Sequence, residues 1–159
     1  MINGGTGGWL AVGERAEHEG AVRIDIRRGA APICADLCAL PFASACFAGA
    51  EILHVLEHLL PTDGQRALAE VHRVLMPGGC LLIGVPDVAK CARTLLAGNE
   101  AVLWNIYSPD ERPAQQHRWG YTHATLRRAL GLAGFVECDD APRHPSDPHE
   151  LRLVAWKHA

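Results

Sequence analysis

The stretch ALAEVHRVLMPGGCLLIGVPD, residues 67–87, contains the two halves of an α/β unit. Its first half has apolar residues at the spacing of one helix face: Leu68, Val71 and Leu75. Residues 77–79, Pro-Gly-Gly, then end the helix. Residues 80–85 form a continuous apolar run without alternation, which is typical of a strand buried on both faces of a parallel sheet. The stretch therefore predicts a helix followed by a central strand.

Strand and helix signals alternate on both sides of this stretch. Strands are expected at 9–12, 21–26, 32–36, 50–55, 135–138 and 151–156. Thr62 and Gln65 form a T-x-x-Q capping box for the helix of the first stretch, and Thr122 caps a later helix that ends at Gly134. A weaker helical pattern covers residues 89–104. The alternation predicts the α/β fold class, with a doubly wound, mainly parallel, Rossmann-like sheet and an antiparallel C-terminal strand.

Length and composition indicate one globular domain over residues 1–159, with residues 1–8 expected to be a flexible leader. The apolar fraction is 48% and the charged fraction 21%, and a net charge of -3 gives no broad attraction to nucleic acid or to an anionic membrane. We expect neither as a partner. No apolar run reaches the length of a membrane span and no signal-peptide pattern opens the sequence, so the expected location is cytoplasmic. The cysteines form no C-x-x-C pair and are expected to be reduced.

The segment HVLEH, residues 54–58, has the His-x-x-Glu-His spacing of inverzincin metalloproteases. That zinc site needs both imidazoles on one face of a helix. The preceding residues resemble a strand, and Pro61 disfavours helical geometry at Leu60, so a helix here would have barely one turn. We therefore expect no metal site and no zinc hydrolase.

Three predicted strands end in polar residues: Asp25, Asp36 and His54. In open α/β sheets, ligands bind beyond the carboxyl ends of the strands, and an acidic residue after the second strand is placed to accept hydrogen bonds from ribose hydroxyls. A solvated strand terminus is the competing interpretation for each residue singly.

Four segments together resemble a known family: CADLCALPF (34–42), ILHVLEHL (52–59), residues 67–87, and HRWGYTHATLRRALGLAGF (117–135). The family is the class I S-adenosylmethionine-dependent methyltransferases of the methyltransferase-11 type. The resemblance implies a methyltransferase fold that binds S-adenosylmethionine. By matching position it implies seven cofactor-binding residues: Gly13, Asp25, Ile26, Asp36, Leu37, Leu53 and His54. Asp25 would bind the ribose hydroxyls, Asp36 the adenine amine, and Leu37 the adenine ring through its backbone N–H.

Two placements of the family's glycine turn remain open. In the first, residues 5–7 (GTG) form the turn, which leaves only residues 1–3 for the first strand. In the second, which we favour, WLAVG (9–13) supplies the strand and Gly13-Glu14-Arg15 the turn. The second resembles a subgroup with a short first crossover, but it places a charged residue where the cofactor's carboxylate would lie.

The resemblance implies methyl transfer to a small-molecule acceptor. His54, His58 and His117 are candidate bases, and His54 is the best placed of them. Residues 89–121 would form an acceptor-side insertion that carries Trp104, Tyr107, Trp119 and Tyr121, which are as compatible with the core as with a pocket. The alternative function is a non-catalytic, degenerate methyltransferase fold that acts as a binding module or partner subunit. A homodimer is also left open.

Overall fold

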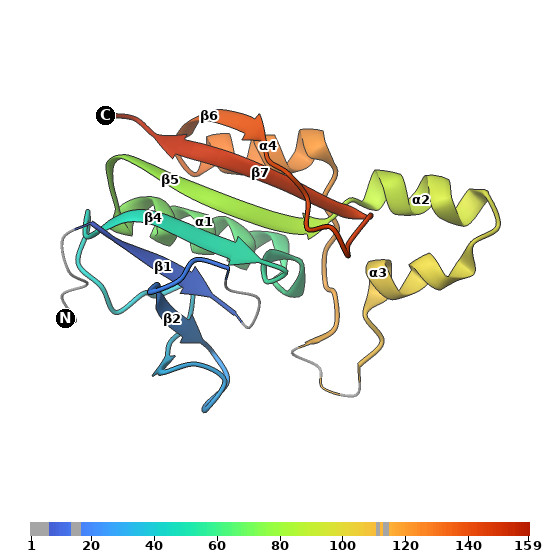
Figure 1. The fold of residues 1–159 in the computed structure, drawn as a ribbon, viewed down its shortest axis with the longest axis horizontal. Helices are drawn as coiled ribbons and strands as arrows, with labels where there is room; N and C mark the ends of the chain where they lie inside the picture. Colours follow the sequence, from blue (N-terminus) through green and yellow to red (C-terminus); the bar gives the residue numbers. More distant parts are fainter. Residues whose placement is uncertain (1–6, 14–16, 111, 113–114) are drawn as a thin grey trace.

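The computed structural model describes residues 7–13, 17–110, 112 and 115–159. Its centre is a seven-stranded sheet with the order β3-β2-β1-β4-β5-β7-β6 (Figure 1). The strands are β1 (Gly8–Val12), β2 (Val22–Asp25), β3 (Ile33–Cys34), β4 (Phe47–Leu53), β5 (Leu75–Pro86), β6 (Phe135–Asp140) and β7 (Glu150–Lys157). Neighbouring strands from β3 to β5 are parallel, and β7 is antiparallel to both of its neighbours. The predicted mainly parallel α/β sheet with an antiparallel C-terminal strand is confirmed.

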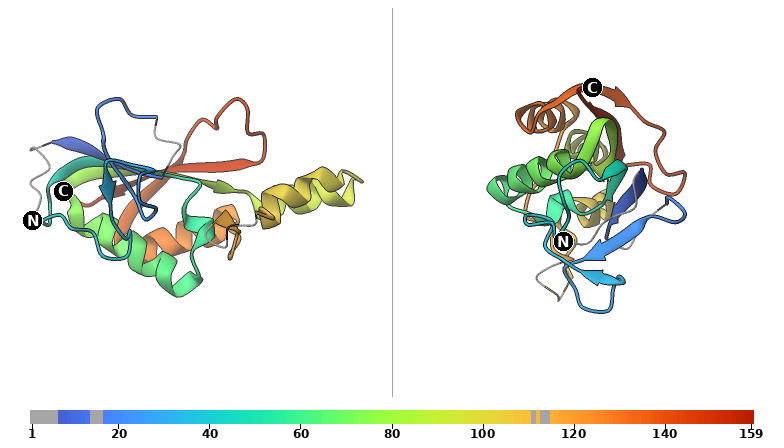
Figure 2. Two further views of the ribbon diagram at one scale, coloured as in Figure 1. Left: turned by 90° about the horizontal axis from the view of Figure 1, so that it is seen from below. Right: turned by 90° about the vertical axis from the view of Figure 1, so that its left-hand side faces the viewer.

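The two long helices beside the sheet lie on the same face. The helical segments are η1 (Leu56–His58), α1 (Pro61–Val74), α2 (Val88–Leu96), η2 (Glu100–Val102), α3 (Leu103–Tyr107) and α4 (His123–Leu132). Figure 2 shows α1 and α4 together on one side of the sheet, whereas the other side carries only loops. The α2–α3 segment extends beyond the carboxyl end of β5 (Figure 1). Among the described residues, no helix is long and apolar enough to cross a membrane.

One predicted helix cap is confirmed by the structure and another is wrong. At α4 the prediction is confirmed, because Thr122 and Thr125 form a reciprocal capping box and Gly134 follows the helix with φ +102. At α1 the predicted cap at Thr62 is wrong. The helix begins two residues earlier, at Pro61, with Leu60, in extended geometry, as a cap without a side-chain hydrogen bond. Proline suits this position because its missing N–H would have no partner inside the helix.

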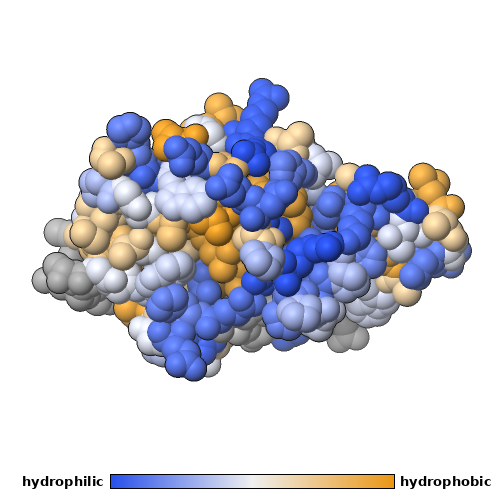
Figure 3. All heavy atoms as spheres, turned by 45° about the horizontal axis from the view of Figure 1, so that its top comes forward, coloured by the Kyte–Doolittle hydropathy of each residue, from blue (hydrophilic) through white to orange (hydrophobic). Residues whose placement is uncertain are grey.

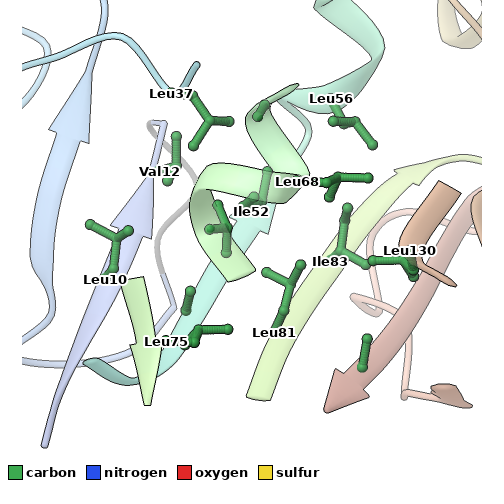
Figure 4. Close-up of a cluster of buried hydrophobic side chains, with 14 of the residues drawn as sticks. Leu10, Val12, Leu37, Ile52, Leu56, Leu68, Leu75, Leu81, Ile83 and Leu130 are labelled. Atoms are coloured by element: carbon green, nitrogen blue, oxygen red, sulfur yellow. The ribbon is translucent and has the colours of Figure 1, made fainter. Parts of the chain in front are cut away.

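The hydrophobic core lies between the sheet and the α1–α4 layer. Figure 4 shows side chains from the strands and from both helices meeting there, among them Leu10, Ile52, Leu68, Ile83 and Leu130, all with 0% exposure. The strand residues among them fix the register of the central strands, because a slip of one residue would turn each strand's apolar side chains to the opposite face.

The opposite face of β5 is less buried than the sequence predicts. Leu81 and Ile83, which face the helices, are inaccessible, but Cys80 and Leu82 are only half-buried. The prediction of burial on both faces is therefore wrong at these two positions, because no helix covers them. Figure 3, in which part of this side is in view, shows hydrophobic residues exposed between hydrophilic ones.

A short crossover covers part of the helix-free face. The ring of Trp9 lies over Gly49, where an added Cβ would come within 2.5 Å of it. His18 stacks on Trp9 with ring centroids 4.3 Å apart. Glu51, 1% exposed in the middle of β4, accepts hydrogen bonds from the backbone N–H groups of Glu17 and His18 at 2.9–3.2 Å. The stacking of His18 on Trp9 and the hydrogen bonds to Glu51 thus hold residues 17 and 18 of the crossover against the sheet.

Candidate active site

The candidate site is a cavity of about 590 Å³ at the carboxyl ends of the parallel strands. β1 lies between β2 and β4, so the chain crosses to one side after β1 and to the other side after β3. Ligands of open α/β sheets bind at such a switch point. The residues that line the cavity include every residue predicted to bind the cofactor: Gly13, Asp25, Ile26, Asp36, Leu37, Leu53 and His54.

Gly13 forms the turn directly after β1. Its φ of +88 belongs to the left-handed region that glycine adopts without strain. A Cβ at this position would also lie 2.7 Å from Cγ2 of Val55. β1, Gly8–Val12, is the strand expected from the second placement of the glycine turn. The residues that follow Gly13 in that turn, 14–16, lie outside the described residues, as does the start of the GTG segment.

Asp25, at the end of β2, is already engaged by Arg27. The backbone N–H of Arg27 donates to Oδ1 at 2.7 Å, and its guanidinium donates to both carboxylate oxygens at 3.1 and 2.9 Å. Burial raises the pKa of Asp25, but these hydrogen bonds and the charge of Arg27 outweigh it and hold the pKa below its usual value. Asp25 is therefore an ionised acceptor, and Arg27 uses three of its acceptor positions.

The opposite wall of this end of the cavity comes from the segment after β3. Asp36 is exposed, and its Oδ1 accepts the backbone N–H of Cys38 at 2.8 Å. Leu37 is 6% exposed, and Ile26 presents an apolar side chain that is 64% exposed. Apolar side chains beside carboxylate acceptors suit a flat, polar-edged ligand such as adenine.

His54 follows β4 and is surrounded by carboxylates. Nδ1 lies 3.3 Å from Glu57, and Nε2 lies 3.3 Å from Glu150 and 3.5 Å from Asp147. Burial raises the pKa of Glu150, but the neighbouring His54 and Arg152 side chains and the N–H of His144 together lower it to about 2. His54 itself has a φ of +55, and its backbone N–H donates to Gly84 at 2.9 Å. It is not helical, so the inverzincin arrangement of His54 and His58 does not form.

Two histidines that line the cavity, His58 and His117, lie next to Glu57. The backbone N–H groups of Arg118 and Trp119 donate to the carbonyl of Glu57 at 2.8 and 3.1 Å, which ties the loop before α4 to η1. The His58 and His117 rings lie 5.0 Å apart. Burial lowers the pKa of His117, against the opposing charge of Glu57.

The aromatic residues of the predicted acceptor-side segment divide between core and surface. Tyr121 is 4% exposed and belongs to the core. Trp104 lines the cavity although it is 66% exposed, and Tyr107 and Trp119 are also exposed.

Sequence reasoning missed three partners of these residues. Arg27 stands two positions after Asp25, where it resembles a solvated charge. Glu57 was considered only as part of a helical zinc motif. Glu150 belongs to a chain of ion pairs in which Arg152 also contacts Glu17 at 2.8 Å. No sequence spacing signals the last contact, because it joins residues far apart in the chain.

Comparison with known proteins agrees with this architecture. Residues 11–83, from β1 into β5, match the sequence model of the methyltransferase domain family. No match was found among curated proteins. The sheet order and the cavity at its switch point are those of the class I methyltransferase fold. The chain as a whole has the class I S-adenosylmethionine-dependent methyltransferase fold.

Solved methyltransferase structures resemble nearly the whole chain. A SAM-dependent methyltransferase from Archaeoglobus fulgidus aligns with a TM-score of 0.66 and 17% identity, over 98% of this chain and 88% of that one. One from Methanosarcina mazei has a TM-score of 0.66 and 16% identity, over 96% and 93%. The 1,6-didemethyltoxoflavin-N1-methyltransferase of Burkholderia thailandensis, with bound 1,6-didemethyltoxoflavin and S-adenosylhomocysteine, has a TM-score of 0.62 and 18% identity, over 97% and 72%.

Proposed function

We propose that the protein transfers a methyl group from S-adenosylmethionine to a small-molecule acceptor. One observation carries the proposal: all seven residues expected to bind the cofactor line a single cavity at the switch point of the sheet. The cavity's volume, about 590 Å³, lies within the range of small-ligand sites. Small-molecule chemistry is supported by the Burkholderia thailandensis enzyme, which holds 1,6-didemethyltoxoflavin.

The residues fit the cofactor at three points. Gly13 lines the cavity at the turn after β1, in a backbone conformation that glycine adopts without strain. Asp25 is an ionised carboxylate suited to a ribose diol, and Asp36 is an exposed acceptor suited to the adenine amine. The cofactor supplies a methyl group on a sulfonium, which is open to in-line displacement. The protein's task is to hold the acceptor in line with that methyl group.

We propose His54 as the base for an acceptor hydroxyl. Glu57 lies beside Nδ1 and orients the ring, as the third group of a catalytic triad does. To act as a base, Nε2 would first lose to solvent the proton that it directs toward Glu150, and its lone pair would then take the proton of the acceptor hydroxyl. His54→Asn tests this role, because asparagine tolerates a positive φ. We expect kcat to fall about 100- to 10,000-fold with S-adenosylhomocysteine affinity changed less than threefold. An unchanged kcat would remove His54 from the chemistry.

The alternative is a non-catalytic binding module with the same fold. The contact that favours it is Arg27, which already occupies Asp25. Calorimetric titration with S-adenosylmethionine and S-adenosylhomocysteine separates the two functions. In a methyltransferase, Asp36→Ala and Asp25→Ala each weaken binding by about 1–3 kcal/mol, roughly ten- to a hundredfold, whereas Asp139→Ala, on exposed β6, has no effect. No heat from the wild type at millimolar ligand would favour the binding module.

A further inference from the structure

The strongest unexplained feature near the cavity is the buried carboxylate of Glu57, the neighbour of the lining residue His58. The residue is 1% exposed, and neither Oε1 nor Oε2 has a hydrogen-bond partner among the described residues. The nearest nitrogens to Oε1 are Nδ1 of His54 at 3.3 Å and Nε2 of His117 at 3.8 Å. Burying a carboxyl group whose oxygens make no hydrogen bonds is costly. A cation beside Glu57 would satisfy both oxygens.

The orientation of His58 and His117 shows which atoms face this carboxylate. Nδ1 of His58 lies 3.2 Å from the carbonyl oxygen of Gln116, and Nδ1 of His117 lies 3.0 Å from that of Asn105. A carbonyl only accepts hydrogen bonds, so both Nδ1 atoms must carry the proton. In the neutral rings Nε2 then holds a lone pair. Histidines that bind metals are fixed in the same way, with the second nitrogen donating to a backbone carbonyl.

Three side chains that can donate lone pairs to a cation thus lie close together. The ligand atoms of Glu57, His58 and His117 all lie within 4.8 Å of one another. Around a tetrahedral ion with bonds of about 2.1 Å they would be about 3.4 Å apart, so small side-chain rotations close the set. Two imidazoles and one carboxylate suit a borderline divalent cation such as Zn²⁺ and leave a fourth position open.

We propose that Glu57, His58 and His117 form a binding site for one divalent transition-metal cation of the Zn²⁺ class. This differs from the sequence expectation of no metal, which considered a helical His54–His58 pair. His54 is not a ligand in the proposed site, and His117 arrives from the loop before α4. Because His58 and His117 line the same cavity as the predicted cofactor residues, the open position faces the acceptor end. An acceptor oxygen bound there would lose its proton more readily, a role that rests on the proposed function.

Metal binding is tested on the full chain after treatment with EDTA. Titration with Zn²⁺ by calorimetry, and with Co²⁺ by its visible absorption, should show one site per chain, and Zn²⁺ should raise the melting temperature. Glu57→Gln, His58→Ala and His117→Ala should each weaken binding at least about a hundredfold, since each removes one of three ligands. His123→Ala is the control, because it removes an exposed imidazole that pairs with Asp140 at 2.8 Å, outside the cavity.

The metal-free variants add a second measurement. Glu57→Gln should melt at or above the temperature of the metal-free wild type, because it removes a buried charge without a hydrogen-bond partner. The metal site is overturned if the wild type binds no Zn²⁺ at concentrations on the order of 100 micromolar, or if His117→Ala binds Zn²⁺ with the affinity of the wild type. Titration with S-adenosylhomocysteine in EDTA tests the proposed function without the metal. Binding of Zn²⁺ without binding of S-adenosylhomocysteine supports the metal site and contradicts the proposed function. Binding of S-adenosylhomocysteine without binding of Zn²⁺ supports the proposed function and contradicts the metal site.

Discussion

Replacing Gly13 by alanine tests how the turn after β1 is built. Two separate penalties are expected. The φ of +88 costs a residue with a Cβ about 1–2 kcal/mol. The added methyl group would also lie 2.7 Å from Cγ2 of Val55, and overpacking of this kind costs about 1–3 kcal/mol. The free energy of unfolding should therefore fall by about 2–5 kcal/mol.

Gly20 provides a matched control for the backbone term. Its φ is +77, but nothing lies within 4 Å of an added Cβ. Gly20→Ala should therefore lose only about 1–2 kcal/mol. Val55→Ala removes the methyl group that meets residue 13, so in the double variant the packing penalty should disappear while the backbone penalty remains. The interaction between residues 13 and 55 is expected to be about 1–3 kcal/mol in a double-mutant cycle.

The assay is equilibrium unfolding in urea, followed by far-ultraviolet circular dichroism and by the fluorescence of the four tryptophans. Equal losses for Gly13→Ala and Gly20→Ala would refute the close contact with Val55. The contact would also be refuted if the double variant lost as much free energy of unfolding as the two single variants added together. In either case the requirement for glycine at position 13 would rest on its backbone conformation alone.

Three further outcomes are expected. Leu81→Asp should prevent soluble expression, because it buries an unpaired carboxylate, whereas Leu82→Asp on the half-buried face should still fold with a lower melting temperature. Cys91, whose burial raises its thiol pKa to about 11, should resist iodoacetamide until the protein unfolds, while the exposed Cys34 reacts in the native state. Glu150 has a pKa of about 2, below its usual value of 4.5, so its charge stabilises the fold fully above about pH 4.5. Roughly 3 kcal/mol of the free energy of unfolding should be lost as the pH falls toward 2. The variant Glu150→Gln should lack this part of the acid-unfolding curve.

The strands and the long helices could be predicted because their signals are local. The apolar run 80–85 and the Thr122 cap need no knowledge of the rest of the chain, and both lie where the sequence placed them. The cap at Thr62 was wrong because two start signals compete within two residues, and Pro61 prevailed. Burial of β5 was overestimated at Cys80 and Leu82, since the run itself does not say which face a helix covers.

The residues in and around the cavity also divide into those that local sequence signals reveal and those that they do not. Asp25, Asp36 and His54 could be found because strand ends are visible in the sequence and meet at one edge of a parallel sheet. The partners that set their chemistry could not. Glu57 and His117 approach one another only because backbone hydrogen bonds from Arg118 and Trp119 hold the loop against η1. A tertiary contact of this kind leaves no periodicity or spacing in the chain.

The described part of the crossover between β1 and β2, residues 17–21, explains why a charged residue is buried on this side of the sheet. The backbone N–H groups of Glu17 and His18 need acceptors, and Glu51 supplies them from the middle of β4. Glu17 in the same crossover then pairs with Arg152, whose guanidinium also holds Glu150 beside His54. Glu17 is thus joined through three successive ion pairs to the histidine at the end of β4, so substitutions of Glu17 should affect the cavity as well as stability.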